Sequence, residues 1–446
     1  MKRRVVLAAM AALSWAAAAL GGDIEDLMRQ REAARESAKQ KLSETPVRKG
    51  RDARGDSARI AEASNRFAFD LYARLTAEEG NVFLSPSSIH TALSMTYAGA
   101  RGRTEKQMAA VLHVPVTEWM IGKPPHPHRE EPWPQEKLHS AYAESLKALE
   151  PGQEAGYELH QANALWGQQD WPWREEFLKL TRDSYGAGLR EVDFAKATEA
   201  ARQTINAWVE QQTKDKIKEL LHEGDVDRLT TLVLTNAIYF KGDWASRFDK
   251  ELTQQADFHV SAGKTVQAPM MNRTGDFGYA ETKDVQILRL PYAGEDLSMI
   301  MFLPREVGRL PAIEKSLTAD ALDKQLKGLG KTKVQVAFPR FRVETRYYLQ
   351  DPLSAMGMPD AFQPRKADFS GMDGKRELYI SKVIHQAFVD VNEEGTEAAA
   401  ATAVVMKREA AAMPKVFRAD RPFLFLIRHE KTGLILFLGR VVNPTL

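Results

Sequence analysis

The first half of the chain carries apolar residues at helical spacing. From residue 58 onward, apolar side chains recur every three or four positions as far as Leu75, which predicts an amphipathic helix. Residues 81–89 predict a short strand leading into a second helix, because Ser85 is a favoured N-cap residue and Pro86 suits the first helical turn. A longer apolar stripe predicts another amphipathic helix over residues 204–221.

Continuous apolar runs in the second half predict buried strands. Residues 231–240 form such a run, and the polar Asn236 within it needs hydrogen-bond partners. Shorter strand-like runs follow at residues 285–291, 297–303, 334–339, 378–391, 423–428 and 434–442. No fixed period recurs, which argues against a repeat protein. The mixture of helices and strands predicts an α+β fold.

Residues 392–406 form an acidic, small-residue segment that suits either a helix or a strand. Its alanines favour a helix, whereas its threonines and valines favour a strand. As a strand it would present one face of Thr396, Ala398, Ala400, Thr402 and Val404, and an opposite face of Glu397, Ala399, Ala401 and Ala403. The first face is small enough to be buried between two existing strands, and Gly395 supplies the freedom of a hinge. By itself a stretch of this composition is more typical of an Ala-rich helical linker or surface helix, and the flanking residues alter that interpretation.

Composition excludes several classes of site. With 43% hydrophobic and 27% charged residues and a formal charge of +2, the chain has the make-up of a globular protein and no electrostatic case for binding nucleic acid. The absence of cysteine excludes disulfides, thiol nucleophiles and thiolate metal sites. His126 and His128 lie in a Pro-rich stretch without a third ligand nearby, so no metal site and no cofactor are expected.

The N-terminus has the pattern of a signal peptide. Three basic residues precede an apolar run from Val5 to Leu20, and two glycines follow. The run is short for a membrane span, so we expect residues 1–22 to be removed on export to the extracellular space or periplasm, with a retained N-terminal anchor as the alternative. Residues 23–57 are rich in charge and poor in large apolar side chains, which predicts a flexible linker.

Six segments in the same order resemble those of serpins, and the resemblance covers nearly all of residues 58–446. The segments are Asn81-Val-Phe-Leu-Ser-Pro-Ser-Ser-Ile89, Asn206-Ala-Trp-Val-Glu-Gln-Gln-Thr-Lys-Asp-Lys-Ile217, Leu234-Thr-Asn-Ala-Ile-Tyr-Phe-Lys-Gly-Asp-Trp244, Ala367-Asp-Phe-Ser-Gly371, Glu393-Glu-Gly-Thr-Glu-Ala398, and residues 420–425 with 439–444. The resemblance implies a single monomeric domain of three β-sheets and eight or nine helices, with an exposed reactive-centre loop.

The resemblance also implies a function without catalytic residues of the chain's own. A target serine protease would cleave the loop and form a covalent acyl-enzyme, and the loop would then insert into the central sheet and distort the protease. The chain would thus be an inhibitor rather than an enzyme. Bulky or charged hinges mark serpins that act instead as binding proteins or chaperones, and small residues here favour inhibition. The hinge comprises Glu393, Glu394, Gly395, Thr396, Glu397, Ala398, Ala399, Ala400, Ala401 and Thr402.

Five further positions match residues with a family role in sheet opening. Ser85, Ser88, Asn236 and His385 match a polar cluster beneath the opening, and Trp244 matches the tryptophan where the loop first inserts. His385 taken alone is equally a buried core histidine, and Trp244 a core tryptophan.

The sequence places the scissile bond only to within a few residues. The family spacing from Gly395 places it between Glu409 and Ala410, with Arg408, Lys407 and Met406 as alternatives. Arg408 would suit a trypsin-like protease, Glu409 a glutamate-specific one, and the alanines from Ala410 an elastase-like one. The helix expected near residues 136–150 has two lysines as its only Lys or Arg residues, so glycosaminoglycan binding is not expected.

Overall fold

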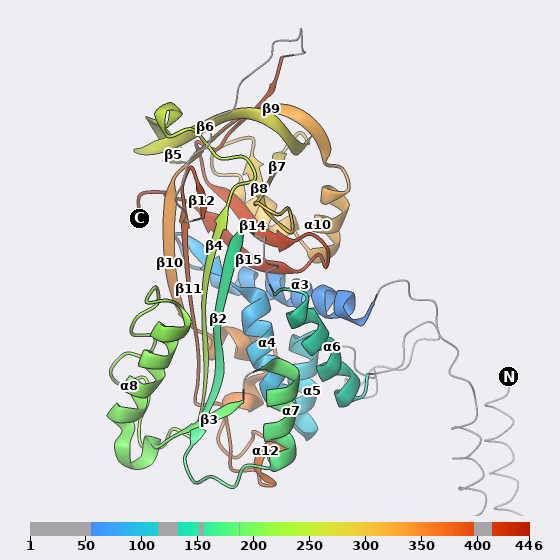
Figure 1. Cartoon of the computed structure of the whole chain (residues 1–446), viewed down its shortest axis with the longest axis vertical. Coiled ribbons are helices and arrows are strands. Elements are labelled where there is room, and N and C mark those ends of the chain that lie inside the picture. The colour runs from blue at the N-terminus through green and yellow to red at the C-terminus, as the bar shows by residue number, and fades with distance from the viewer. Residues whose placement is uncertain (1–54, 115–132, 151–155, 187, 397–412) are drawn as a thin grey trace, which may run out of the picture. The chain divides into compact units, whose positions relative to one another are not determined.

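A six-stranded sheet forms the centre of the computed structural model, which describes residues 55–114, 133–150, 156–186, 188–396 and 413–446. Its strand order is β10-β11-β12-β4-β2-β3, and β11 also pairs directly with β4 in parallel. The strands are β2 (Tyr157–Gln168), β3 (Leu189–Val192), β4 (Leu232–Asp243), β10 (Phe341–Tyr348), β11 (Lys382–Val391) and the two-residue β12 (Gly395–Thr396). Figure 1 shows the long strands upright and side by side.

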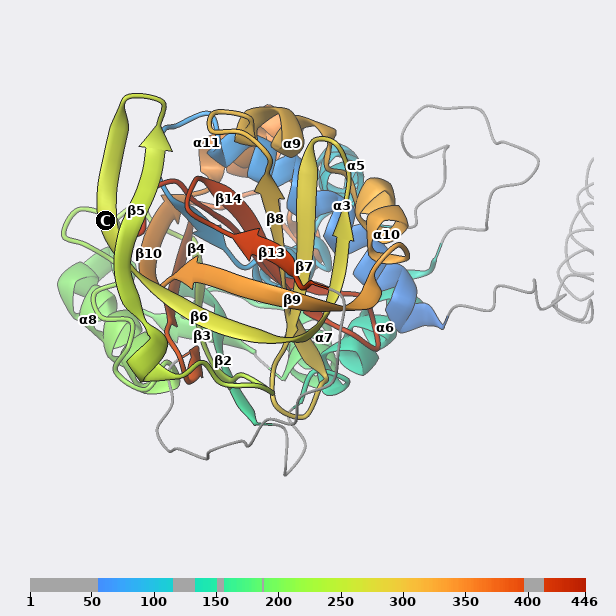
Figure 2. The same cartoon turned by 90° about the horizontal axis from the view of Figure 1, so that it is seen from above.

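A second network of nine strands adjoins it, in the order β1-β15-β14-β8-β7-β6-β9-β13, with β5 paired to β6. These are β1 (Val82–Leu84), β5 (Gln254–Ser261), β6 (Lys264–Glu281), β7 (Val285–Pro291), β8 (Leu297–Pro304), β9 (Gly330–Pro339), β13 (Lys415–Arg418), β14 (Phe423–His429) and β15 (Ile435–Val441). The 18-residue β6 pairs with β5, β9 and β7 in turn. In Figure 2, β6 and β9 run across the view, whereas β7 and β8 run up it. The long strand β6 therefore hydrogen-bonds to strands that run in different directions. Because it joins them, the strands form two hydrogen-bonded networks instead of the three separate sheets expected.

Helices cover both faces of the six-stranded sheet. The described residues contain ten α-helices, more than the eight or nine expected because short ones such as the four-residue α12 add to the number. They are α3 (Asp56–Leu75), α4 (Pro86–Tyr97), α5 (Gly102–Val111), α6 (Gln135–Lys147), α7 (Glu175–Tyr185), α8 (Phe194–Gln212), α9 (Leu310–Ser316), α10 (Ala319–Leu326), α11 (Gln350–Met356) and α12 (Ser370–Asp373), with 3-10 helices η1 (Lys250–Leu252) and η2 (Pro359–Phe362). Figure 1 shows α8 on one side of the long strands and α4 on the other. The predicted α+β class is confirmed.

The N-terminal boundary and the second helix agree closely with the sequence pattern. Helix α3 begins at Asp56, two residues inside the segment expected to be a linker. Ser85 is the N-cap of α4, where its hydroxyl accepts a hydrogen bond from the Ser88 N–H, and Pro86 opens the helix as predicted. Residues 1–54 lie outside the described part of the chain, and no helix in the described part is long and apolar enough to cross a membrane.

The helix predicted over residues 204–221 was wrong at both ends. Helix α8 begins earlier, at Phe194, and ends at Gln212. Lys214 and Asp215 have positive φ angles of 50° and 60°, which cannot continue a right-handed helix. The apolar residues beyond them are buried nevertheless, as part of an irregular segment packed on the sheet.

Candidate functional site

A polar rung crosses three strands of the six-stranded sheet at one level. His385 of β11 lies opposite Asn236 of β4, which in turn lies opposite Asn163 of β2. Ser85 and Ser88, at the start of α4, approach the same level from the face opposite α8. The structure thus brings together four of the residues assigned from the resemblance and adds Asn163.

Both ring nitrogens of His385 form hydrogen bonds only if the imidazole is neutral. Nδ1 bonds to the Asn236 Oδ1, which only accepts, so Nδ1 carries the proton. Nε2 must then accept from the Ser85 N–H, 3.1 Å away. Complete burial of the ring lowers the pKa of His385 from 6.5 to about 3. The rung therefore links β11, β4 and α4 without any buried charge.

Asn163 was not recognised from the sequence. Its Oδ1 accepts from the Ser88 Oγ at 2.7 Å and from the Asn236 Nδ2 at 2.5 Å. Asn236 Nδ2 also donates to the Ser88 Oγ at 2.7 Å, so the two asparagines and the serine form a closed triangle. Residues 157–168 also contain the polar Glu158, His160 and Gln161, so Asn163 does not stand out there as Asn236 does in its apolar run.

The hinge occupies the upper end of the seam between β11 and β4. Residues of β12 pair antiparallel with both neighbours: Thr396 lies opposite Val391 on one side and Gly242 on the other. Gly395 has φ +151°, and a Cβ there would lie 2.0 Å from the Gly242 carbonyl oxygen, so only glycine fits. Thr396 is fully buried, with its hydroxyl 3.1 Å from the Tyr292 hydroxyl.

Trp244 fixes the chain just before the hinge. Its indole N–H donates to the Asn392 carbonyl at 2.9 Å, and its backbone N–H donates to the Glu394 carbonyl at 2.9 Å. The ring stacks on Tyr292 at 4.7 Å between centroids. Trp244 is thus both a core residue and a direct contact of the hinge.

Two carboxylates at the start of the hinge are held by cations. Glu393 is 1% exposed and bonds to the Arg340 guanidinium, with an N–O distance of 2.6 Å from Nε, and to the Thr253 hydroxyl. Burial acts to raise the pKa of Glu393, but the hydrogen bonds from Arg340 and Thr253 outweigh it and lower the pKa. Glu394 pairs with Lys250 at 2.6 Å. The hinge is therefore anchored by ion pairs immediately before Gly395.

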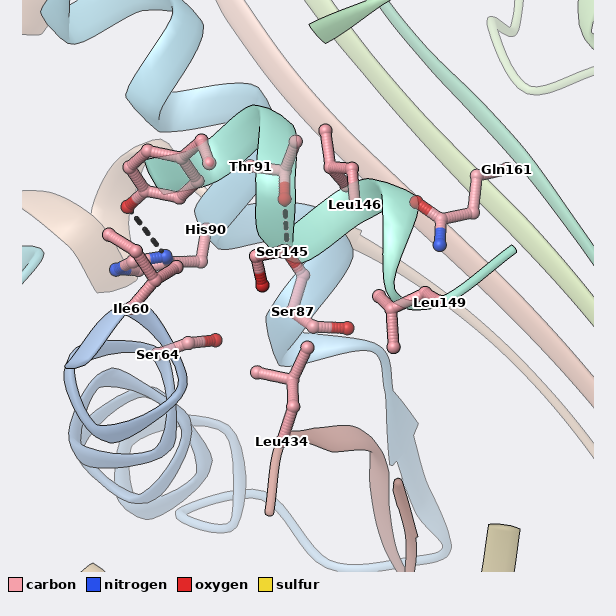
Figure 3. Close-up of a pocket in the computed structure, with 11 residues that line it drawn as sticks. Ile60, Ser64, Ser87, His90, Thr91, Ser145, Leu146, Leu149, Gln161 and Leu434 are labelled. Atoms are coloured by element: carbon pink, nitrogen blue, oxygen red, sulfur yellow. Dashed lines mark hydrogen bonds between the residues drawn. The ribbon is translucent and has the colours of Figure 1, made fainter. Parts of the chain in front are cut away.

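A small cavity adjoins the rung on the α4 side (Figure 3). It lies between α3, α4 and α6, and Gln161 of β2 lines it while accepting a 3.2 Å hydrogen bond from Asn163. His90 in its wall bonds through one nitrogen to the Tyr142 hydroxyl and through the other to the Leu112 carbonyl. Because both nitrogens are engaged, His90 is a structural residue of the core.

The other residues assigned to the loop lie outside the part of the chain that the structure describes. Residues 397–412 contain Glu397, Ala398, Ala399, Ala400, Ala401 and Thr402 of the hinge, and Met406, Lys407, Arg408, Glu409 and Ala410 around the scissile bond. The loop and the choice among these bonds therefore stay predictions.

The six-stranded sheet thus holds β12 between β11 and β4, above a polar rung that links the same two strands. The family model for Serpin (serine protease inhibitor) matches residues 62–444. The human leukocyte elastase inhibitor is 42% identical over 395 residues, which cover 86% of this chain and 99% of that protein. An uncharacterised serpin-like protein of Thermococcus kodakarensis is 42% identical over 394 residues, covering 87% of each chain. Serpin48 of the insect Tenebrio molitor has a similar structure, with a TM-score of 0.74, 34% identity, and coverage of 86% of this chain and 98% of that one. The chain belongs to the serpin family.

Proposed function

We propose that this serpin inhibits serine proteases as a suicide substrate whose cleaved loop inserts into the six-stranded sheet. The observation that carries the proposal is β12, because Gly395 and Thr396 already lie between β11 and β4. The residues that follow Thr396 are Glu397 and four alanines, which a seam between two strands can accept without overpacking.

The register of β12 determines where an inserted loop would place its side chains. Thr396 lies opposite Gly242, and an antiparallel strand continued without a bulge would place Thr402 opposite Asn236. The side chains of Asn236 and Thr402 would then share the face that carries the rung. On the other face, Glu397 would lie opposite Lys241, where the opposite charges attract.

Insertion would exchange the partners of the rung. A new strand between β11 and β4 separates His385 from Asn236, so their hydrogen bond is lost. The Thr402 hydroxyl would arrive at the same level and can both accept from and donate to these groups. The polar rung thereby keeps its hydrogen bonds in the inserted state, which favours insertion over leaving buried polar groups unpaired.

Three kinds of protease test the proposal. Trypsin, an elastase and a glutamate-specific protease are each incubated with the purified protein, followed by denaturing gels and mass spectrometry of the released peptide. We expect a covalent complex stable to boiling with at least one enzyme, and the elastase is the first choice because a relative is named for inhibiting one. The released peptide identifies the bond among Glu409–Ala410 and the alternatives at Arg408, Lys407 and Met406.

A hinge variant provides the matched control. Thr396→Arg places a long cation where the native side chain is fully buried, so insertion is blocked while the loop sequence stays intact. The variant should be cleaved as a plain substrate without forming the complex. Cleavage of the wild type by all three enzymes with no complex would instead favour a binding protein or chaperone.

We further propose that the protein is exported and loses residues 1–22. The basic start and apolar run support this proposal. The intact mass of protein recovered from the medium or periplasm tests it, and a full-length mass in a membrane fraction would favour the retained anchor.

A further inference from the structure

Exposed cations gather on the surface formed by the start of α5 and the turns on either side of α12. These six side chains, named the cationic patch, come from three short segments and are Arg103, Lys106, Arg365, Lys366, Lys375 and Arg376. Hydrogen bonds hold the segments together. The Arg101 N–H donates to the Asp368 carbonyl at 2.8 Å, and the Asp368 N–H donates to the Thr104 hydroxyl at 2.9 Å. The formal charge of +2 for the whole chain does not reveal this local excess.

The acidic side chains of the same segments are mostly withdrawn from the surface. Three aspartates of residues 101–106 and 359–377 are buried, namely Asp360, Asp368 and Asp373. Glu105 is partly buried, and burial raises its pKa. Glu377 is the only exposed acid of these two stretches, both of which the structure describes in full. Six exposed cations therefore face solvent with one exposed carboxylate among them.

Two of the buried carboxylates orient exposed arginines. The Nε of Arg103 lies 2.9 Å from Asp360, and the Nε of Arg376 lies 2.9 Å from Asp368. Both arginine side chains nevertheless remain 77% exposed. A guanidinium bound through Nε keeps its terminal N–H groups available for paired hydrogen bonds with an oxyanion. The buried carboxylates thus hold two forked donors at the surface without lying in the path of an anion.

The patch has a mixed-charge border at α7 and lies away from the hinge. The Arg174 N–H, just before α7, donates to the Met372 carbonyl of α12 at 2.7 Å. Exposed charges of both signs follow along α7, including Glu175, Glu176 and Arg182. In Figure 1, α12 lies at the lower end of the long strands and β12 lies toward their upper end. A ligand on the patch would therefore leave the hinge uncovered.

The separation of the cations over three segments favours an extended ligand. A ligand with many negative charges along its length neutralises more of these side chains than a single small anion does. We propose that the cationic patch binds a flexible polymer of sulfate or phosphate groups. Arg103 and Arg376 form paired hydrogen bonds with individual groups, and the other four cations supply charge. The surface is separate from α6, whose Lys or Arg residues are Lys137 and Lys147 alone.

Two variants of the patch separate charge from directional contact. Lys106→Gln, Lys366→Gln and Lys375→Gln together remove three positive charges and leave both arginine–aspartate pairs intact. Arg376→Lys keeps the charge but loses the forked donor. We expect Arg376→Lys to weaken binding about three-fold with an unchanged dependence on salt. Equal affinity of this variant and the wild type would refute the directional contact.

The matched control removes three exposed lysines from the nine-stranded network. Lys264→Gln, Lys331→Gln and Lys333→Gln, on β6 and β9, change the net charge by the same amount. Comparison with this control separates an effect of the patch from an effect of the net charge of the protein.

Fluorescence anisotropy measures binding of the purified protein to labelled inorganic polyphosphate and to labelled dextran sulfate over a range of salt concentrations. The logarithm of the wild-type binding constant should fall against the logarithm of the salt concentration with a slope of about −3, as for about four neutralised charges on a flexible polyanion. The triple patch variant should bind about ten-fold more weakly or worse, with a slope smaller in magnitude by about 2, and the control should stay within about two-fold of the wild type. Preference for one polymer identifies sulfate or phosphate as the group bound. Absence of binding to both polymers, equal weakening in the control, or binding to vesicles of anionic lipid alone would overturn the proposal.

Discussion

Acidification should weaken the native sheet through His385. The folded protein holds His385 neutral with a pKa of about 3, whereas an unfolded histidine has a pKa of 6.5. The unfolded chain therefore binds a proton below pH 6.5 that the folded chain excludes, and the stabilisation is complete above pH 6.5 and lost as the pH falls toward 3. At pH 5 the loss from this residue is about 2 kcal/mol, since one pH unit corresponds to about 1.4 kcal/mol.

Two other buried histidines add to the same dependence. Burial lowers the pKa of both His90 and His139 to about 4. Between pH 6.5 and 5 the three residues together lower the free energy of unfolding by about 5 kcal/mol, an average of about 3 kcal/mol per pH unit. Over this pH interval the loss approaches the entire free energy of unfolding of a marginally stable domain.

Urea unfolding of the uncleaved protein at pH 5 to 8 measures this dependence, and His385→Gln isolates one residue. The variant should be less stable at pH 8, where the rung is intact in the wild type, and its pH slope should be smaller by about one proton. If His385→Gln retains the full slope, His385 does not exclude a proton and the neutral rung is refuted.

Three other substitutions test separate contacts. Arg340→Ala removes the cation that pairs with the buried Glu393 carboxylate and should lower the free energy of unfolding by about 2 kcal/mol. The loss is smaller than for a fully buried pair because Arg340 is 42% exposed. Denaturant unfolding measures the change. Gly395→Val should lower the thermal transition of the uncleaved form because the Cβ meets the Gly242 carbonyl, and an unchanged transition would contradict the docked hinge. Thr402→Val should destabilise the cleaved form by about 1 kcal/mol and leave the uncleaved form unaltered, with Thr402→Ser restoring stability in cleaved-form unfolding.

The polar rung was only partly recoverable from the sequence. Asn236 was conspicuous because it interrupts a run of apolar residues, and His385 was assigned from the resemblance. Asn163 lies among other polar residues of its strand, where a polar side chain is usually exposed, and only its pairing with Asn236 shows its role. The role of Asn163 depends on the register between β2 and β4. Sequence periodicity does not specify the register between distant strands.

The end of α8 was not predictable from apolar spacing. Burial selects apolar residues whether or not the backbone is helical, so Leu220 and Leu221 continued the stripe beyond the helix. A helix usually ends at glycine when it turns into the left-handed region, but here Lys214 and Asp215 adopt positive φ. The Lys214 ammonium lies 2.6 Å from a carboxylate oxygen of Glu158 on β2, a tertiary contact that apolar spacing does not encode.

The backbone pairing at the seam between β11 and β4 implies that side-chain contacts would control insertion of a strand there. β11 and β4 share one parallel ladder from Lys382 to Phe388, whereas β12 pairs antiparallel with both strands. An inserted loop would replace that single parallel ladder with two antiparallel ones, which gains hydrogen bonds and favours the inserted state. Under the proposed mechanism the uncleaved sheet would persist for kinetic reasons, through contacts that must break before the new ladders form. The His385–Asn236 bond is such a contact, since it joins side chains of β11 and β4 that an inserted strand would part.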